Sequence, residues 1–141
     1  MPNKPVVYES NLRIKFSDLD PYDHLRTSAY SRYYVDHRMD GLRKHVGWDL
    51  ERLEQLPFMT WVRRMEVDFL RPVVGDQEIA IRSFVREFRS SDAYIECSMV
   101  DDGGEEMSRC LMIVAYVDKS TKRAKDWPAD TMSLFFHGDM I

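Results

Sequence analysis

The sequence predicts an α+β domain, in which an antiparallel sheet of about five strands packs against one long helix. Two observations predict this class. A segment in the first third of the chain carries apolar residues at the 3.6-residue spacing of a helix, whereas later segments alternate apolar and polar residues at the two-residue spacing of strands. Clusters of Gly, Pro, Ser and Asp separate these later segments, as expected for strands joined by turns. We expect residues 1–141 to form a single domain.

The first strand is predicted over residues 11–17. Leu12, Ile14 and Phe16 alternate there with polar residues, which is typical of a strand with one buried face. The three apolar side chains are therefore expected to point toward the core.

The long helix is predicted from an apolar stripe at i, i+4, i+7 and i+11, which consists of Val35, Met39, Leu42 and Val46. Thr27 or Ser28 is expected to cap its N-terminus, and Gly47 to end it. Gly41 lies in the helix interior, where glycine is unfavourable, so it predicts the close approach of another backbone.

Two short helices are predicted as well. One covers residues 49–55, with Leu50 and Leu53 facing inward. The other covers residues 128–136, with Pro128 at its first helical position.

Four strands are predicted in the second half of the chain: one between Pro57 and the turn sequence RPVVGD, and three over residues 77–88, 93–101 and 105–118. In the first of these, one face is expected to hold Met59, Trp61, Met65, Val67 and Phe69, and the other Thr60, Arg64, Glu66 and Asp68. Such an alternation is typical of an antiparallel sheet with one solvated side.

The two cysteines are predicted to face each other. A two-residue turn at Gly103 and Gly104 places Cys97 directly opposite Cys110 in a hairpin. In a reducing cytoplasm we expect packed thiols rather than a disulfide. Neither cysteine lies in a CxxC sequence, so no structural zinc site is expected.

The composition limits the functional classes. Hydrophobic residues make up 44% and charged residues 31% of the chain, the balance of a soluble globular protein. The net charge of -4 argues against a nucleic-acid partner, because binding of phosphates needs a basic surface. The N-terminal residues lack the apolar core of a signal peptide, and no apolar run approaches the ~18 residues of a membrane span. We therefore expect a cytoplasmic protein with no membrane partner.

An acidic cluster lies just before the long helix and consists of Asp18, Asp20 and Asp23, followed by His24. Asp residues are common in turns and helix caps, and paired acids are also common in active sites. The residues alone leave both interpretations open.

The segment FSDLDPYDHLRTSAYSRYYVDHR, residues 16–38, resembles the signature of hotdog-fold acyl-CoA thioesterases of the 4-hydroxybenzoyl-CoA thioesterase family. That signature runs approximately D-x-D-x-x-G-H-V-N-N-x-x-Y, followed by a helix with an E-x-R pair. The segment DFLRPVVGDQEIAI, residues 68–81, is similar to the family's Y-L-R-P-L-x-x-G-D turn. The resemblance implies a hotdog fold, in which the sheet wraps around the long helix and two subunits join their sheets edge to edge. Active sites would then lie between subunits.

The resemblance also implies roles for individual residues. Asp20 matches the family's catalytic carboxylate, which acts as general base or nucleophile. His24 matches the histidine that follows it. The backbone N–H near Thr27 is the implied donor to the oxyanion, and Tyr30 matches the tyrosine that opens the helix. Asp23 stands where the family usually has glycine.

The helix that follows matches the family at two further positions. Asp36 and Arg38 match the E-x-R pair, and Asp36 is also expected to pair with Arg32 one turn earlier. His37 and His45 lie outside the apolar stripe, so both are expected at the surface.

The turn after the third strand is where relatives often hold the nucleotide end of coenzyme A, and its residues here are Arg89, Ser90 and Ser91. A plain hairpin turn is the alternative for this segment.

The implied function is hydrolysis of an acyl-CoA thioester, without a cofactor or metal, by a homodimer or a dimer of dimers. One alternative is a hotdog module that binds acyl-CoA without turnover. Another is an enoyl-thioester hydratase. The segment DLDPYDH, residues 18–24, resembles the D-x-N-P-x-H motif of such hydratases. Asp20 replaces its asparagine, however, and one extra residue precedes His24, so the spacing disfavours hydration.

Overall fold

The computed structural model describes residues 4–138 and confirms the α+β class. The strands are β1 (Tyr8–Arg13), β2 (Phe58–Phe69), β3 (Glu78–Arg89), β4 (Asp92–Asp101) and β5 (Glu106–Asp118). The helices are α1 (Tyr30–Val46), α2 (Leu50–Gln55) and α3 (Ala129–Met132), with 3-10 turns at Phe16–Asp18, Thr27–Ala29 and Ser133–Phe135. No helix among the described residues is long and apolar enough to cross a membrane.

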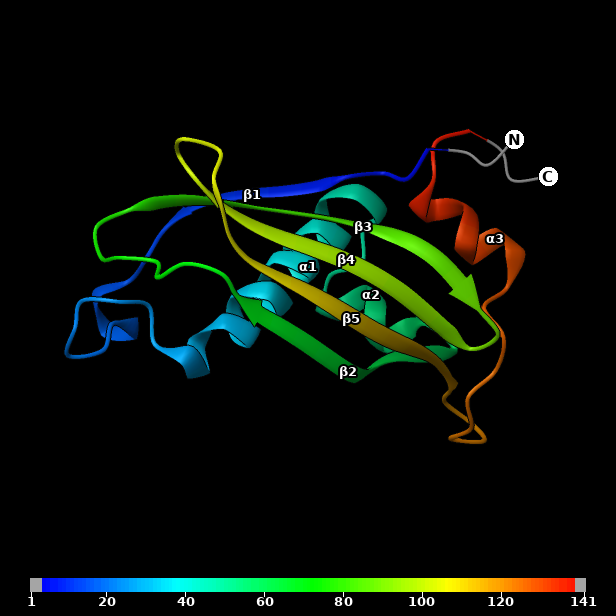
Figure 1. The fold of residues 1–141 in the computed structure, drawn as a ribbon. Coiled ribbons are helices and arrows are strands. Elements are labelled where there is room, and N and C mark those ends of the chain that lie inside the picture. The colour runs from blue at the N-terminus through cyan, green and yellow to red at the C-terminus, as the bar shows by residue number, and fades with distance from the viewer. Residues whose placement is uncertain (1–3, 139–141) are drawn as a thin grey trace.

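The sheet has five strands in the order β1-β3-β4-β5-β2, and every neighbouring pair is antiparallel. Helix α1 lies along one face of the sheet (Figure 1). Strands β1 and β2 are the two edges of the sheet. The chain passes from one edge to the other through α1 and α2, which follow β1 and precede β2. Edge strands carry unpaired backbone groups that can accept another strand.

Strand β1 lies earlier in the chain than predicted. It ends at Arg13, and the chain then makes a 3-10 turn over Phe16–Asp18. Ile14 is buried as expected, but Phe16 is 89% exposed because the turn carries its side chain away from the core. Tyr8, which the prediction left outside the strand, is almost fully buried.

Helix α1 ends as predicted but begins differently. Gly47 adopts a left-handed conformation with φ of 72°, and its N–H donates to the carbonyls of Leu42 and Arg43. At the other end, the prediction that Thr27 or Ser28 caps the helix is wrong. A 3-10 turn runs directly into α1, and no side chain caps the N-terminus.

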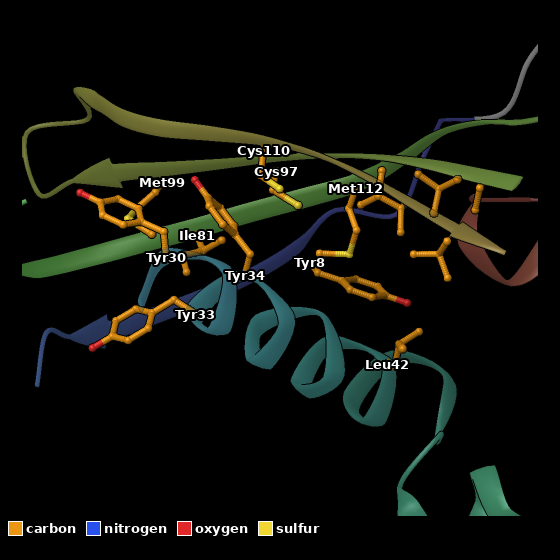
Figure 2. Close-up of a cluster of buried hydrophobic side chains, with 14 of the residues drawn as sticks. Tyr8, Tyr30, Tyr33, Tyr34, Leu42, Ile81, Cys97, Met99, Cys110 and Met112 are labelled. Atoms are coloured by element: carbon orange, nitrogen blue, oxygen red, sulfur yellow. The ribbon is translucent and has the colours of Figure 1, made fainter. Parts of the chain in front are cut away.

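The buried face of α1 is rotated away from the predicted apolar stripe. Its buried residues are Tyr30, Tyr33, Tyr34, His37, Arg38, Gly41 and Leu42. Figure 2 shows Tyr30 and Tyr34 pointing from this helix toward the strands, whereas Tyr33 points to the side. Of the predicted stripe, only Leu42 is buried, and the other members are half-buried. The prediction that His37 lies at the surface is wrong, because its side chain is only 2% exposed, whereas His45 is exposed as expected.

Gly41 marks a close approach, although to a side chain rather than to another backbone. A Cβ at this position would lie 2.1 Å from Cδ2 of Tyr8. The Tyr8 ring therefore occupies the space that any other residue at this position would need for its side chain.

A β-bulge in β2 reverses the predicted faces of its first half. Val62 pairs with Val114 and Arg64 with Ile113, so Arg63 is an extra residue in the strand. Met65, Val67 and Phe69 keep the predicted inner face, because they pair with Met112, Cys110 and Ser108. Before the bulge, the inner face instead holds Phe58, Thr60 and Val62, and the prediction for Met59 and Trp61 is wrong.

The short helices follow the prediction in position but not in every side chain. The side chain of Asp49 caps α2 by accepting the N–H of Arg52 at 2.8 Å. Leu53 packs against the core, but Leu50 is 81% exposed, contrary to the prediction. At the C-terminus, Pro128 precedes helix α3 rather than opening it.

Cys97 pairs with Cys110 across β4 and β5, as predicted, and both are buried free thiols (Figure 2). The turn, however, is one residue longer than predicted, because the N–H of Asp101 donates to the carbonyl of Glu105. An irregularity between Met99 and Val100 compensates for the extra residue. The two differences cancel, so the cysteine register is retained.

Candidate active site

Asp18 is a structural residue of the loop before α1. Its carboxylate accepts a hydrogen bond of 2.6 Å from Tyr33 Oη and pairs with Arg32, and its carbonyl accepts the N–H of Arg26 at 2.7 Å. The hydrogen bond from Tyr33 and the positive charge of Arg32 hold the pKa of Asp18 below its ordinary value, although burial opposes this shift. Arg32 therefore pairs with Asp18, and the predicted pair with Asp36 does not form.

Asp20 sits in a tight loop that fixes its carboxylate. Oδ1 accepts the backbone N–H of Tyr22 at 2.8 Å and that of His24 at 3.1 Å. The N–H of Asp20 donates in turn to the carbonyl of His24 at 2.8 Å. These backbone hydrogen bonds, led by that from His24, lower the pKa of Asp20 despite its partial burial, so the group is charged at neutral pH. Both bonds within the described chain use Oδ1, which leaves Oδ2 for water or a ligand.

Asp23 occupies a position that favours glycine. Its φ is 63°, in the left-handed region that Gly enters freely and that Asp and Asn tolerate better than most residues. The turn that it forms lets the N–H of Asp23 donate to the carbonyl of Asp20 at 3.1 Å. Aspartate at this position is thus compatible with the left-handed turn.

The two sequence motifs contact each other in the structure. Leu25 N–H donates to the carbonyl of Val73 at 2.6 Å, and Gly75 N–H donates to the carbonyl of Asp23 at 2.9 Å. His24 and Val74 also form an isolated β-bridge. The RPVVGD turn therefore supports the loop that carries Asp20, and a Cβ at Gly75 would approach Oδ1 of Asp23 to 2.7 Å.

A surface hollow of about 260 Å³ collects four of the predicted site residues: Asp20, His24, Thr27 and Tyr30. Its other wall is Leu25 and the end of β2 with the following turn, Phe69, Leu70, Arg71 and Pro72. Tyr30 is buried, which raises the pKa of its hydroxyl, and the nearby charge of Asp20 contributes in the same direction. Residues 69–72 belong to the second motif but were not predicted as site residues, since sequence spacing does not reveal which loop lies across the hollow.

The hollow also lies beside a helix N-terminus. The 3-10 turn Thr27–Ala29 continues directly into the 17-residue helix α1. The first N–H groups of a helical segment lack intrahelical acceptors, and the helix dipole gives them partial positive charge. Thr27, which opens the turn, brings such groups to the hollow.

Four predicted residues lie elsewhere. Asp36 is exposed on α1 in a separate depression that also includes Arg13 and Lys15. Arg89 ends β3, and Ser90 and Ser91 form the turn to β4, at the opposite end of the sheet from the Asp20 loop (Figure 1). The carbonyls of the two serines accept the N–H groups of Trp127 and Tyr116. A single chain thus does not bring this turn to Asp20.

A buried polar chain under α1 was not predicted. Arg38 Nη1 donates to Ser83 Oγ at 2.9 Å, Ser83 Oγ contacts His37 Nε2 at 2.7 Å, and His37 Nδ1 contacts Ser10 Oγ at 2.7 Å. Arginine can only donate, so Ser83 Oγ accepts from Arg38. Burial lowers the pKa of His37, so the ring is neutral at pH 7, and one of its nitrogens donates while the other accepts.

Comparisons with known proteins agree with this fold. The structure is similar to that of a hypothetical protein from Staphylococcus aureus in complex with CoA, with a TM-score of 0.83, 11% sequence identity, and 95% of this chain and 84% of that chain covered. It is similar to YbaW, a probable thioesterase from Escherichia coli, with a TM-score of 0.82, 15% identity and coverage of 92% and 98%. A thioesterase from Thermus thermophilus complexed with coenzyme A and Zn gives a TM-score of 0.74, 22% identity and 90% coverage of each chain.

At these identities the similarity establishes the hotdog fold and not the activity. No curated protein matches the sequence. The model of one family, the Thioesterase-like superfamily, matches residues 14–135, which include both motifs and the whole sheet apart from β1. The protein therefore belongs to the Thioesterase-like superfamily.

Proposed function

We propose that the protein hydrolyses acyl-CoA thioesters, with Asp20 acting on the thioester as general base or nucleophile. The observation that carries this proposal is the fixed, charged carboxylate of Asp20 in a hollow beside the N-terminus of α1. Membership of the Thioesterase-like superfamily and similarity to CoA complexes support the substrate class.

Thioester hydrolysis needs an attacking group and a site for the negative charge that forms on the carbonyl oxygen. Because Oδ1 of Asp20 is held by two backbone N–H groups, Oδ2 can accept a proton from water or attack the carbonyl carbon. A low pKa makes the carboxylate a weak base in the open hollow. A bound acyl group would exclude water from it, and desolvation raises a carboxylate pKa.

The N–H groups at Thr27 and the next residue are the proposed donors to the oxyanion. They are fixed by the backbone of the 3-10 turn, so little reorganisation is needed when the charge forms. His24 and Tyr30, which line the same hollow, are proposed to hold the acyl group and the thioester in place. Asp36, together with Arg89, Ser90 and Ser91, would contact substrate only in an assembly of two chains.

We further propose that the enzyme is a homodimer joined through β2. This strand is an edge of the sheet, and apolar side chains on and just after it, Trp61, Val62, Phe69 and Leu70, are exposed. Pairing of two β2 strands would cover these side chains and the free backbone groups. An antiparallel pair would also bring the far end of one sheet toward the Asp20 hollow of the other. Light scattering should give a mass well above the 16.7 kDa of one chain, and a monomer at micromolar concentration would contradict the proposed dimer.

Replacement of Asp20 tests the mechanism directly. Asp20→Asn retains the size of the side chain and an oxygen for the two backbone N–H groups, but removes the charge. General-base and nucleophilic roles commonly contribute factors of ~10² to 10⁴, so thiol release should fall by that range while binding of coenzyme A, measured by calorimetry, is retained. Asp23→Asn is the matched control, because it removes an exposed carboxylate from the same loop and keeps a residue that tolerates φ of 63°.

A panel of aliphatic and aromatic acyl-CoAs distinguishes the alternatives. Release of free thiol supports hydrolysis, whereas binding without thiol release would indicate a module without turnover. If Asp20→Asn turned over at the parent rate and Asp23→Asn did not, the role assigned to Asp20 would be wrong.

A further inference from the structure

A second hollow lies between the C-terminal half of α1 and the inner face of the sheet, apart from the Asp20 site. Its volume is about 70 Å³, and it is walled by α1, strands β2 to β5, and the aromatic side chains of Trp127 and Phe135. Its lining side chains are aliphatic, thioether or aromatic except for those of Arg38 and Thr60. The cavity is thus an apolar space with one cationic residue in its wall.

Arg38 is buried without a counterion. Its side chain is 5% exposed, and its one hydrogen bond goes to a neutral acceptor, Ser83 Oγ, at 2.9 Å. No carboxylate among residues 4–138 lies within salt-bridge distance of its guanidinium, which instead lies 4.3 Å over the ring centre of Tyr8. An arginine remains charged in a protein, and a desolvated charge is costly unless it is paired.

A second buried donor lies in the same wall. The indole Nε1–H of Trp127 is buried and has no hydrogen-bond partner among the described residues. Indole and guanidinium groups can only donate. The wall therefore holds donors that lack an acceptor, which an anionic, oxygen-bearing ligand would supply.

We propose that this cavity binds an aliphatic chain that ends in a carboxylate, and that Arg38 pairs with the carboxylate. The apolar wall suits the chain, and the guanidinium forms paired hydrogen bonds with a carboxylate in a desolvated site. One water-sized group needs roughly 10 to 15 Å³, so about 70 Å³ accommodates a chain of about five to seven heavy atoms.

Two sources share this chemistry. One is a free short-chain fatty acid. The other is the acyl group of a thioester whose far end carries a second carboxylate, and this source rests on the proposed thioesterase function. Under either source, recognition depends on the charge of Arg38.

Binding of butanoate, compared with butan-1-ol, tests the cavity without reference to catalysis. By calorimetry or ligand-observed NMR, the wild-type protein should bind butanoate in preference to the alcohol. Arg38→Met keeps the length of the side chain and removes its charge, so it should weaken butanoate binding by about tenfold or more and leave the alcohol unaffected. Arg43→Met is the matched control, because it removes an exposed arginine from the same helix and should leave butanoate binding unchanged.

Hydrolysis assays then identify the source. Succinyl-, glutaryl- and adipoyl-CoA are each compared with the straight-chain acyl-CoA of the same length. A preference in kcat/KM for the dicarboxylic series that Arg38→Met abolishes supports the acyl group as ligand, whereas butanoate binding without such a preference supports the free acid.

Equal binding of butanoate and butan-1-ol by the wild-type protein would overturn the inference, as would unchanged butanoate binding by Arg38→Met. If Arg38→Met fails to fold, the comparison of butanoate with butan-1-ol binding by the wild-type protein alone decides whether the inference holds. Absence of thiol release from every thioester would overturn the proposed function only, since butanoate binding does not depend on it.

Discussion

The buried histidine of α1 should make the stability of the protein depend on pH in a defined range. Burial is the main cause that lowers the pKa of His37 from its ordinary 6.5 to about 4, and the adjacent charge of Arg38 acts in the same direction. The folded protein therefore holds His37 neutral at pH values where the unfolded chain would protonate it. Its contribution to stability is complete above pH 6.5 and is lost as pH falls toward 4.

The size of the effect follows from that difference. Each unit of pKa corresponds to about 1.4 kcal/mol, so the shift of His37 from 6.5 to about 4 amounts to about 3 kcal/mol of unfolding free energy. Small domains have about 5 to 15 kcal/mol in total, so this is a large share. The carboxylates whose pKa values are lowered, such as Asp18 and Asp20, lose their contributions mainly below their ordinary values of about 4. Between pH 6.5 and 4, the change of unfolding free energy with pH is thus dominated by the buried His37.

His37→Gln isolates this contribution, because glutamine can still hydrogen-bond Ser83 but does not titrate. Urea unfolding of both proteins should be measured at several pH values between 7 and 4. The His37→Gln substitution is expected to lower the free energy of unfolding at pH 7, because glutamine does not fill the space of the imidazole ring. The difference in unfolding free energy between the wild-type protein and the variant should then shrink by about 3 kcal/mol as pH falls toward 4, because only the wild-type protein loses the contribution of His37. Parallel stability curves for the two proteins over this range would refute a buried, neutral His37.

Two further substitutions test the packing around the site. Gly41→Ala should destabilise the protein by about 1 to 3 kcal/mol, because the new methyl group would overlap the buried ring of Tyr8. This loss is expected although alanine is the better helix former. An unchanged or raised melting temperature would contradict the observed contact. Asp18→Asn should cost about 1 to 3 kcal/mol in chemical denaturation, because Arg32 loses its partner and the buried hydrogen bonds change, while kcat of the folded protein changes little. A large loss of kcat at unchanged stability would instead assign Asp18 to the chemistry.

The elements of this fold could be predicted from periodicity, because helices and strands leave local patterns. Strands β3, β4 and β5 and the end of α1 at Gly47 all lie within about a residue of the prediction. The faces of the elements were harder to predict. In β2 a single extra residue, Arg63, shifts the alternation, and nothing in the local pattern marks it.

The burial of His37 and Arg38 could not be predicted for a related reason. Polar residues on a helix are usually exposed, and these two are buried only because Ser10 of β1 and Ser83 of β3 supply hydrogen bonds. Those partners lie far away in sequence. The predicted apolar stripe of α1 was therefore centred too close to Val35 and Met39. These two residues are half-buried and line the cavity that Arg38 also lines.

The candidate site was predicted only in its local part. Asp20, His24, Thr27 and Tyr30 lie within eleven residues of one another and share one hollow. The turn of Arg89 to Ser91 lies at the other end of the sheet, so it would approach an Asp20 loop only in the proposed dimer. Proximity within one loop can be inferred from sequence spacing, whereas the position of a distant turn relative to that loop cannot.

The contact between the two motifs explains why the Asp20 loop adopts a geometry that its own residues would not fix. The left-handed conformation of Asp23 is uncommon for a residue with a side chain, so an isolated loop would populate other conformations. Hydrogen bonds from Gly75 to Asp23 and from Leu25 to the carbonyl of Val73 hold the loop in this conformation. With the loop so held, the N–H groups of Tyr22 and His24 both reach Oδ1 of Asp20. The second motif thus acts on the carboxylate through the backbone, and the two motifs are required together although about fifty residues separate the positions that are in contact.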